Sequence, residues 1–219
     1  MTRYPPFPRR AALVAGLGLA AMTGLGPLGM FTLQGLPDIA AAPDAAESRA
    51  LLRPLLTALW AFAAIAVLDI VVAVGLDRVF RPVWPAMSRG AMILRIAYAI
   101  ILAGLCLHLL AARRLVQGGT DDGIQGALQQ VTVFSDGWGL SLSIFGLHLL
   151  ALAAVGLRAP FLPGWIAWLV GLAGLGYLID AIGLALTPDY ALNLAAYVFL
   201  GELILMLWLL FRAFRPPRP

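Results

Sequence analysis

Six long apolar runs constrain the fold of this chain more than any other feature. They lie at residues 11–30, 55–76, 90–112, 138–157, 165–186 and 191–211. Each has about the 20 residues that an α-helix needs to cross roughly 30 Å of hydrocarbon. Backbone polar groups inside lipid must be bonded within their own segment, so each run should be helical. The sequence therefore predicts an all-α, polytopic membrane protein with six transmembrane helices in a single domain, residues 1–219.

The composition fits a bilayer and excludes several other classes. Of the 219 residues, 62% are hydrophobic and 12% are charged, whereas a soluble domain has about half apolar and about a quarter charged residues. These values exclude an ordinary soluble globule, a disordered tail and a basic domain that binds nucleic acid. The single cysteine, Cys106, lies inside an apolar run. It can therefore form no intramolecular disulfide, and no cysteine-based metal cluster is expected.

The arginines predict how the chain is oriented in the membrane. All 15 basic residues are arginine. With six spans, the side that holds both termini collects 10 of them, the other side has 4, and Arg95 lies inside a span. Arginine is enriched in cytoplasmic loops. We therefore expect cytoplasmic N- and C-termini and the lipid bilayer as the main partner, and leave a homodimer open.

The outer loops and the tryptophans carry weaker signals. The spacing of Asp44 and Glu47 is that of a helix N-terminal capping box, which predicts a short interfacial helix over about 45–53. A second one is expected over about 123–134. Tryptophans near span ends are typical interfacial anchors. We expect this role for Trp84, Trp138, Trp165, Trp168 and Trp208.

Asp69 and Arg95 are ionisable residues inside predicted spans. Such groups are costly in hydrocarbon and usually pair with one another. At a rise of about 1.5 Å per residue, Asp69 lies about 5 Å and Arg95 about 9 Å to the cytoplasmic side of mid-span. Arginine can hold a carboxylate through two hydrogen bonds. We therefore expect a structural ion pair between the second and third spans.

Polar residues in the last three predicted spans indicate a second cluster of polar side chains. His148 and Glu202 lie within about 2 Å of mid-span, and Asp180 about 7 Å outward. If these spans are neighbours, the three side chains could converge on one pocket, together with Tyr177 and Ser141. The alternative is a hydrogen-bond network that only fixes helix packing. Three further polar residues are expected at the outer rim: His108, Asp136 and Asn193.

Several of these residues belong to motifs that resemble a known family. The motifs are Phe145-Gly-Leu-His148-Leu-Leu, Leu157-Arg158, Phe161-Leu-Pro163, Gly171-Leu-Ala-Gly174-Leu-Gly176-Tyr177-Leu-Ile-Asp180, Gly201-Glu202 and Trp208, with Leu68-Asp69, Arg81-Pro82-Val83 and Arg95 earlier in the chain. Together they resemble the six-span membrane family known as domain of unknown function 4386. The resemblance implies an integral protein of the bacterial inner membrane. It implies no activity, substrate, cofactor or catalytic residue.

Three function classes remain open at this point. Intramembrane Asp, Glu and His groups act as coupling sites in transporters, which favours binding or translocation of a proton, an ion or a small amphiphile. A membrane-embedded enzyme is the first alternative, in which His108 or His148 with Asp180, Asp136 or Glu202 would hold zinc. The chain has no His-x-x-x-His spacing to support it. A structural or accessory membrane subunit is the second alternative.

Overall fold

The chain is helical almost throughout. A computed structural model describes residues 7–37, 45–187, 190, 192 and 194–215, and none of these lies in a β-strand. The helices are α1 (Arg9–Gln34), α3 (Ala45–Phe80), α4 (Pro85–Gln117), α5 (Asp121–Gly156), α6 (Gly164–Leu186), α7 (Ala195–Val198) and α8 (Leu200–Phe214). The predicted all-α class is therefore confirmed.

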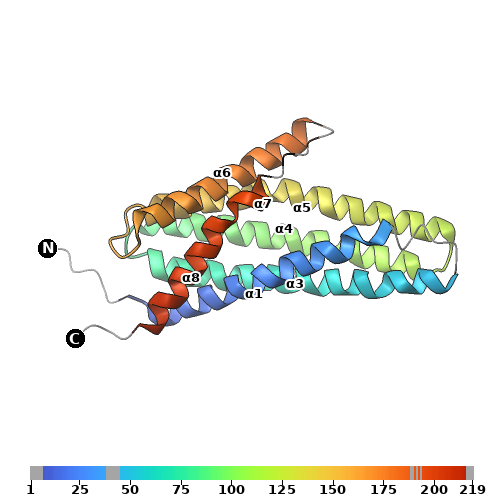
Figure 1. The fold of residues 1–219 in the computed structure, drawn as a ribbon, viewed down its shortest axis with the longest axis horizontal. Coiled ribbons are helices and arrows are strands. Elements are labelled where there is room, and N and C mark those ends of the chain that lie inside the picture. The colour runs from blue at the N-terminus through green and yellow to red at the C-terminus, as the bar shows by residue number, and fades with distance from the viewer. Residues whose placement is uncertain (1–6, 38–44, 188–189, 191, 193, 216–219) are drawn as a thin grey trace.

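The six longer helices form a ring. Each packs on the next in chain order, α1 on α3, α3 on α4, α4 on α5, α5 on α6 and α6 on α8, and α8 returns to pack on α1. Figure 1 shows α1 beginning and α8 ending at the same end of the bundle. At that end the Arg9 Nε donates a hydrogen bond to the Ala213 carbonyl oxygen over 2.9 Å. The ring encloses the side chains that form the candidate site.

The lengths and outer faces of the helices are those of a multi-pass membrane protein. Five helices, α1, α3, α4, α5 and α6, are long and apolar enough to cross a bilayer. Large apolar side chains cover the outside of the ring, where a water-soluble bundle would carry polar ones. Examples are Trp60, Ile93, Ile100, Trp168 and Ile182, all more than half exposed.

The sixth predicted span differs from the other five. The expected run at 191–211 is divided into the single turn α7 and the 15-residue α8. At about 1.5 Å per residue, α8 is about 22 Å long, which is shorter than the roughly 30 Å of a bilayer core. Six full spans are therefore not confirmed. The helical hydrogen bonds become irregular at Phe199, whose carbonyl oxygen accepts from both Glu202 and Leu203.

The two predicted interfacial helices are wrong as separate elements. Residues 45–53 belong to α3, which continues through Pro54, and residues 123–134 belong to α5. Both helices have 36 residues, or about 54 Å at the α-helical rise. At the end where α4 meets α5, the helices α3 and α5 extend beyond α6 and α8 (Figure 1). At that turn the Thr120 hydroxyl oxygen caps α5 by accepting from the Gly123 N–H over 3.1 Å.

Glycines bring the last three long helices close together. A Cβ on Gly174 of α6 would lie 2.7 Å from the carbonyl oxygen of Gly146 of α5, and the reverse holds for Gly146. A Cβ on Gly201 of α8 would collide with the backbone of Leu169 in α6. Small residues at such crossings let membrane helices approach closely. This close packing places Tyr177 and Glu202 on neighbouring helices at the inside of the ring.

Candidate functional site

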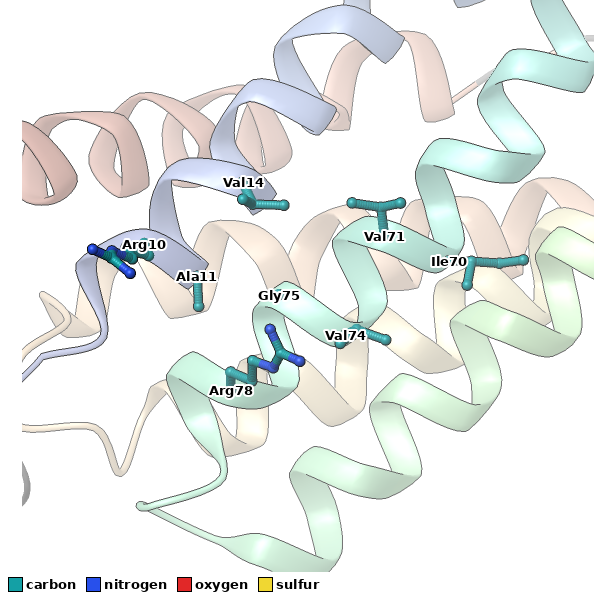
Figure 2. Close-up of a pocket in the computed structure, with 8 residues that line it drawn as sticks. All are labelled: Arg10, Ala11, Val14, Ile70, Val71, Val74, Gly75 and Arg78. Carbon is teal, nitrogen blue, oxygen red and sulfur yellow. The ribbon is translucent and has the colours of Figure 1, made fainter.

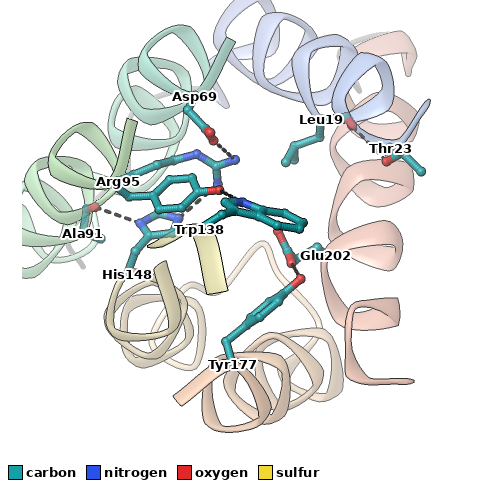
Figure 3. Close-up of polar contacts among 10 residues, drawn as sticks. Leu19, Thr23, Asp69, Ala91, Arg95, Trp138, His148, Tyr177 and Glu202 are labelled. Carbon is teal, nitrogen blue, oxygen red and sulfur yellow. Dashed lines mark hydrogen bonds and ion pairs between the residues drawn. The ribbon is translucent and has the colours of Figure 1, made fainter. Parts of the chain in front are cut away.

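An ion pair joins α3 to α4 inside the ring. The Arg95 Nη2 lies 2.7 Å from the Asp69 Oδ1, and each side chain is only 2% exposed. Arg95 is the largest fully buried side chain among the described residues. The pair lies about 15 Å along α4 from its first residue, Pro85. Two opposite charges are thus held together inside the ring of helices (Figure 3).

His148 of α5 lies against the same arginine. Its Nδ1 is 2.8 Å from the Ala91 carbonyl oxygen, and its Nε2 is 3.2 Å from the Arg95 Nη1. A carbonyl oxygen can only accept, and a guanidinium can only donate. The geometry therefore assigns a neutral imidazole that carries its proton on Nδ1 and accepts from Arg95 on Nε2. His148 thus contacts α4, and its imidazole makes no hydrogen bond to α6 or α8 among the described residues.

The Phe145 ring lies between the polar groups. The Arg95 guanidinium carbon is 5.0 Å from its centroid, a distance at which a cation is attracted to a ring face. Ring centroids of three further residues lie 5.0–5.6 Å away: Tyr98, His148 and Tyr177. The Arg95 Nε has no hydrogen-bond partner in the described part of the chain. Phe145 therefore links the ion pair on one side to the α6 residues on the other.

Glu202 of α8 and Tyr177 of α6 form the second polar contact. The Tyr177 hydroxyl donates to the Glu202 Oε1 over 2.9 Å. Glu202 is partly buried and belongs to the first turn of α8. No cationic side chain of the described residues lies within ion-pair distance of it. We call the group formed by Asp69, Arg95, Phe145, His148, Tyr177 and Glu202 the central cluster.

Asp180 has a different environment. Its Oδ1 accepts from the Tyr190 hydroxyl over 2.6 Å and from the Leu194 N–H over 2.9 Å. Its Oδ2 accepts from the Ala195 N–H over 2.6 Å, so the carboxylate caps the start of α7. The bond to Asp180 raises the pKa of Tyr190, which lies outside the membrane-spanning helices, to about 12. No hydrogen bond within the described residues joins Asp180 to His148 or Glu202. The three residues expected in one pocket thus have three separate sets of partners: His148 bonds to α4, Glu202 to Tyr177, and Asp180 to the segment after α6.

None of the other expected site residues that the structure describes hydrogen-bonds to the central cluster. The Ser141 hydroxyl is buried and donates to the Trp138 carbonyl oxygen of its own helix over 2.7 Å. The His108 Nδ1 lies 2.7 Å from the Gln130 Oε1 and links α4 to α5. Asp136 is exposed. Asn193 lies outside the described residues.

Tyr98 and Trp138 form a contact that the sequence analysis missed. The Trp138 Nε1 donates to the Tyr98 hydroxyl oxygen over 2.9 Å, and the indole packs on Phe62. Trp138 thus packs against residues of α3 and α4, and α5 begins 17 residues before the predicted span, while its role as an interfacial anchor stays a prediction. Trp138, Phe145 and His148 are spaced by seven and then three residues along one helix, which could have indicated a shared inner face.

Asp77 is a buried carboxylate that the sequence analysis also missed. It pairs with Arg81, four residues later, and accepts from the Ser88 hydroxyl over 2.9 Å. The hydrogen bond to Asp77 raises the pKa of the Arg81 guanidinium further above its ordinary value. This contact closes the turn between α3 and α4 at the end of the bundle, so we assign it to folding.

The described residues offer no metal cluster, and two pockets of the structure lie away from the central cluster. No group of three or more His, Cys, Asp or Glu side chains in the described ranges could hold a metal ion. Two surface pockets, of about 340 and 440 Å³, lie at the end where α1 begins. No residue of the central cluster lines either of them.

The comparison with protein families shows which family the chain is related to. The family model described as "Domain of unknown function (DUF4386)" matches residues 14–213. The chain belongs to this family. The resemblance found in the sequence motifs is thereby confirmed, and the DUF4386 match runs from the first turns of α1 to the last turn of α8.

A relative from an archaeon extends this finding. The DUF4386 chain is 27% identical to an "Uncharacterized protein" of Archaeoglobus fulgidus over 161 residues, which is 74% of this chain and 86% of the relative. No solved structure matches the chain. The comparisons therefore establish the family, and the activity must be argued from the geometry of the central cluster.

Proposed function

We propose that the protein binds a proton at Glu202, inside the membrane, and that this binding controls the contact between α6 and α8. The charge balance of the central cluster supports the proposal. Asp69 and Arg95 neutralise each other, and the hydrogen bonds of His148 fit a neutral imidazole. Glu202 is then the one carboxyl group of the cluster without a countercharge. A charge left unbalanced in hydrocarbon is costly, and a bound proton removes it.

The surroundings of Glu202 give this proton a structural effect. The Tyr177 hydroxyl donates to a carboxylate or to the carbonyl oxygen of a carboxylic acid. Bonds to an ionised acceptor are shorter and about twice as strong as neutral ones. The α6–α8 contact should therefore tighten when the proton leaves and relax when it binds. The irregular turn at Phe199, directly before α8, is the element that would absorb such a movement.

Infrared difference spectroscopy tests the proposal in lipid bilayers. A carboxylic acid has a C=O stretching band that a carboxylate lacks, so the spectrum reports the proton directly. Wild-type protein should show such a band near neutral pH that decreases at alkaline pH. Glu202→Gln should remove it, and the matched control Asp136→Asn, at an exposed carboxyl group, should keep it. A wild-type spectrum without this band, or a Glu202→Gln spectrum that retains it, would contradict the proposal.

A structural or accessory subunit is the second candidate function. The observation that favours it is the Asp69–Arg95–His148 network, in which charges and ring nitrogens are paired with one another. Under this reading, Glu202 and Tyr177 would only hold α8 in place. Glu202 would then stay ionised from about pH 6 to pH 9, well above the ordinary carboxyl range, and Glu202→Gln would lower thermal stability by the same amount throughout that interval. Proton binding instead predicts that the stability difference between the variant and wild type depends on pH.

The membrane in which the chain lies and its orientation there are also proposals. We place the chain in a bacterial inner membrane with both ends in the cytoplasm, on the strength of the uneven arginine count. A green fluorescent protein fused after Pro219 should then fluoresce, and alkaline phosphatase inserted after Gly118 should be active. The reverse result would invert the orientation. A homodimer, an ion other than the proton and a small amphiphilic ligand stay predictions without a supporting contact.

A further inference from the structure

A groove lies on the outside of the ring between α1 and α3. Its volume is about 340 Å³, within the range of about 300–1,000 Å³ that is typical of small-molecule sites. The two helices approach closely here because Gly75 has no side chain. A Cβ at Gly75 would lie 3.1 Å from the Ala15 Cβ and 3.2 Å from the Ala11 carbonyl oxygen. Figure 2 shows Ala11 and Gly75 facing each other at this crossing.

The walls of the groove are apolar. They are formed by Val14 of α1 and by Ile70, Val71 and Val74 of α3. Val14, Ile70 and Val71 are 40–46% exposed on the outer face of two helices that are long enough to span a bilayer. Lipid chains are the solvent at such a surface, so these walls suit an acyl chain better than a polar ligand.

Two arginines line the same groove. Arg10 comes from the first turn of α1 and Arg78 from the last turn of α3, and both are exposed. Figure 2 shows both side chains toward the end of the groove where α1 begins. Neither takes part in an ion pair within the described ranges, whereas Arg81 and Arg95 each pair with an aspartate. No acidic residue lines the groove, so two positive charges are left for an anion.

The start of α1 adds to this positive end. Its first turn contains no acidic residue, and no side chain caps it. A helix N-terminus carries about half a positive charge and favours anions. Phosphate oxygens, in turn, are frequent partners of arginine through charge-assisted hydrogen bonds. The positive charges and the apolar walls therefore meet in one groove, as the phosphate and the acyl chain meet in one lipid.

We infer that this groove is a binding site for one anionic phospholipid. Its phosphate would lie at Arg10 and Arg78, and one acyl chain would follow Val14, Ile70 and Val71. Basic sites between transmembrane helices on the cytoplasmic side are known to take anionic headgroups, and both arginines lie on the side predicted to be cytoplasmic. The inference does not depend on proton binding at Glu202, since no residue of the central cluster lines the groove.

Native mass spectrometry of the whole protein in detergent tests the site. The probes are phosphatidylglycerol and phosphatidylcholine with identical acyl chains, added at equal concentration. Two arginines at a membrane surface favour an anionic headgroup over a zwitterionic one, so the wild type should prefer phosphatidylglycerol by at least about tenfold. Arg10→Gln/Arg78→Gln should remove this preference. Arg89→Gln/Arg114→Gln, which removes the same charge at exposed positions outside the groove, should keep it.

A second variant tests the apolar part of the groove. Val74→Trp keeps both arginines but fills the space beside them, so it should also lower phosphatidylglycerol binding about tenfold. If size-exclusion chromatography shows that the double arginine variant does not fold, Val74→Trp alone tests whether the groove binds the lipid. The inference is overturned if Arg10→Gln/Arg78→Gln keeps the preference or if the control pair loses it equally. It is also overturned if soluble glycerol 3-phosphate displaces the lipid at equal concentration, since the groove would then add nothing.

Discussion

At the scale of single residues, the central fact is that Arg95 is buried with two different partners. The Asp69 carboxylate balances its charge, and the His148 Nε2 accepts one of its N–H groups. Each partner comes from a different helix, so one guanidinium ties α3 and α5 to α4. Removing either partner would leave a donor or a charge inside the ring without compensation.

The first prediction concerns Asp69. Asp69→Asn leaves Arg95 as an uncompensated buried charge and should lower the free energy of unfolding by about 3–5 kcal/mol. The double variant Asp69→Leu/Arg95→Met removes both charges and should be more stable than the single variant. Denaturation in mixed detergent micelles measures both values. Equal losses for the single and the double variant would show that the ion pair is not the cause.

The second prediction concerns Tyr190. Its pKa is raised from 10 to about 12 by the hydrogen bond to Asp180. A proton that is held more tightly in the folded state stabilises that state. This contribution is complete below about pH 10 and is lost as the pH rises through about 12. The tyrosinate absorbance of wild type minus Tyr190→Phe should therefore have its midpoint near pH 12, and a midpoint near pH 10 would contradict the Asp180 contact.

At the scale of helices, close crossings position the site. α6 can approach α5 only because Gly146 and Gly174 lack side chains, and it can approach α8 only because Gly201 does. The same small-residue positions occur in the family-like motifs of the sequence. Their role in the structure is to bring Tyr177 within reach of Glu202.

The third prediction compares two glycines of α6. Gly174→Ala would place a methyl group 2.7 Å from the Gly146 carbonyl oxygen, and overpacking of this kind costs about 1–3 kcal/mol. Gly171→Ala is the control, because its methyl group would lie 3.4 Å from the Ala153 Cβ, an ordinary contact. Thermal unfolding should separate the two variants, with a loss only for Gly174→Ala. Similar stabilities would argue against the tight α5–α6 crossing.

The fourth prediction concerns the outer ends of α4 and α5. A helix of about 54 Å cannot be contained in about 30 Å of hydrocarbon, and the surplus lies where α4 meets α5. In a Cys106→Ala background, a cysteine at exposed Gln129 should react with a membrane-impermeant maleimide in vesicles. A cysteine at Leu172, which is 52% exposed on the outside of α6, should not react. Equal protection of both positions would place the α5 end inside the bilayer.

At the scale of the whole molecule, the ring of helices explains which parts of the fold could be predicted. Hydropathy identified all the long helices because lipid imposes a uniform requirement on every residue of a span. It could not identify their outer ends, since a helix that leaves the membrane has no such requirement, and 45–53 and 123–134 were therefore read as separate elements. It also could not detect the break at Phe199, because the chain remains apolar there.

The sequence predicted one contact of the site, the ion pair between two helices that follow each other in the chain. Asp69 and Arg95 lie on consecutive antiparallel helices, so their depths alone suggested contact. His148 was assigned to Asp180 and Glu202 because the order of helices around the ring, and the side of α5 that faces α4, cannot be read from hydropathy. The environment of Asp180 could not be predicted because the segment that binds it, 10 to 15 residues later in the chain, folds back onto α6.

The most direct test of the central cluster is solid-state NMR of protein labelled with ¹⁵N-histidine and ¹⁵N-arginine in lipid bilayers, with His108→Gln used to assign His148. We expect a neutral imidazole with its proton on Nδ1 and an unprotonated Nε2 that correlates with an arginine Nη, and we expect Arg95→Met to remove that correlation. A doubly protonated imidazole, or an Nε2 without an arginine neighbour in wild-type protein, would contradict the cluster.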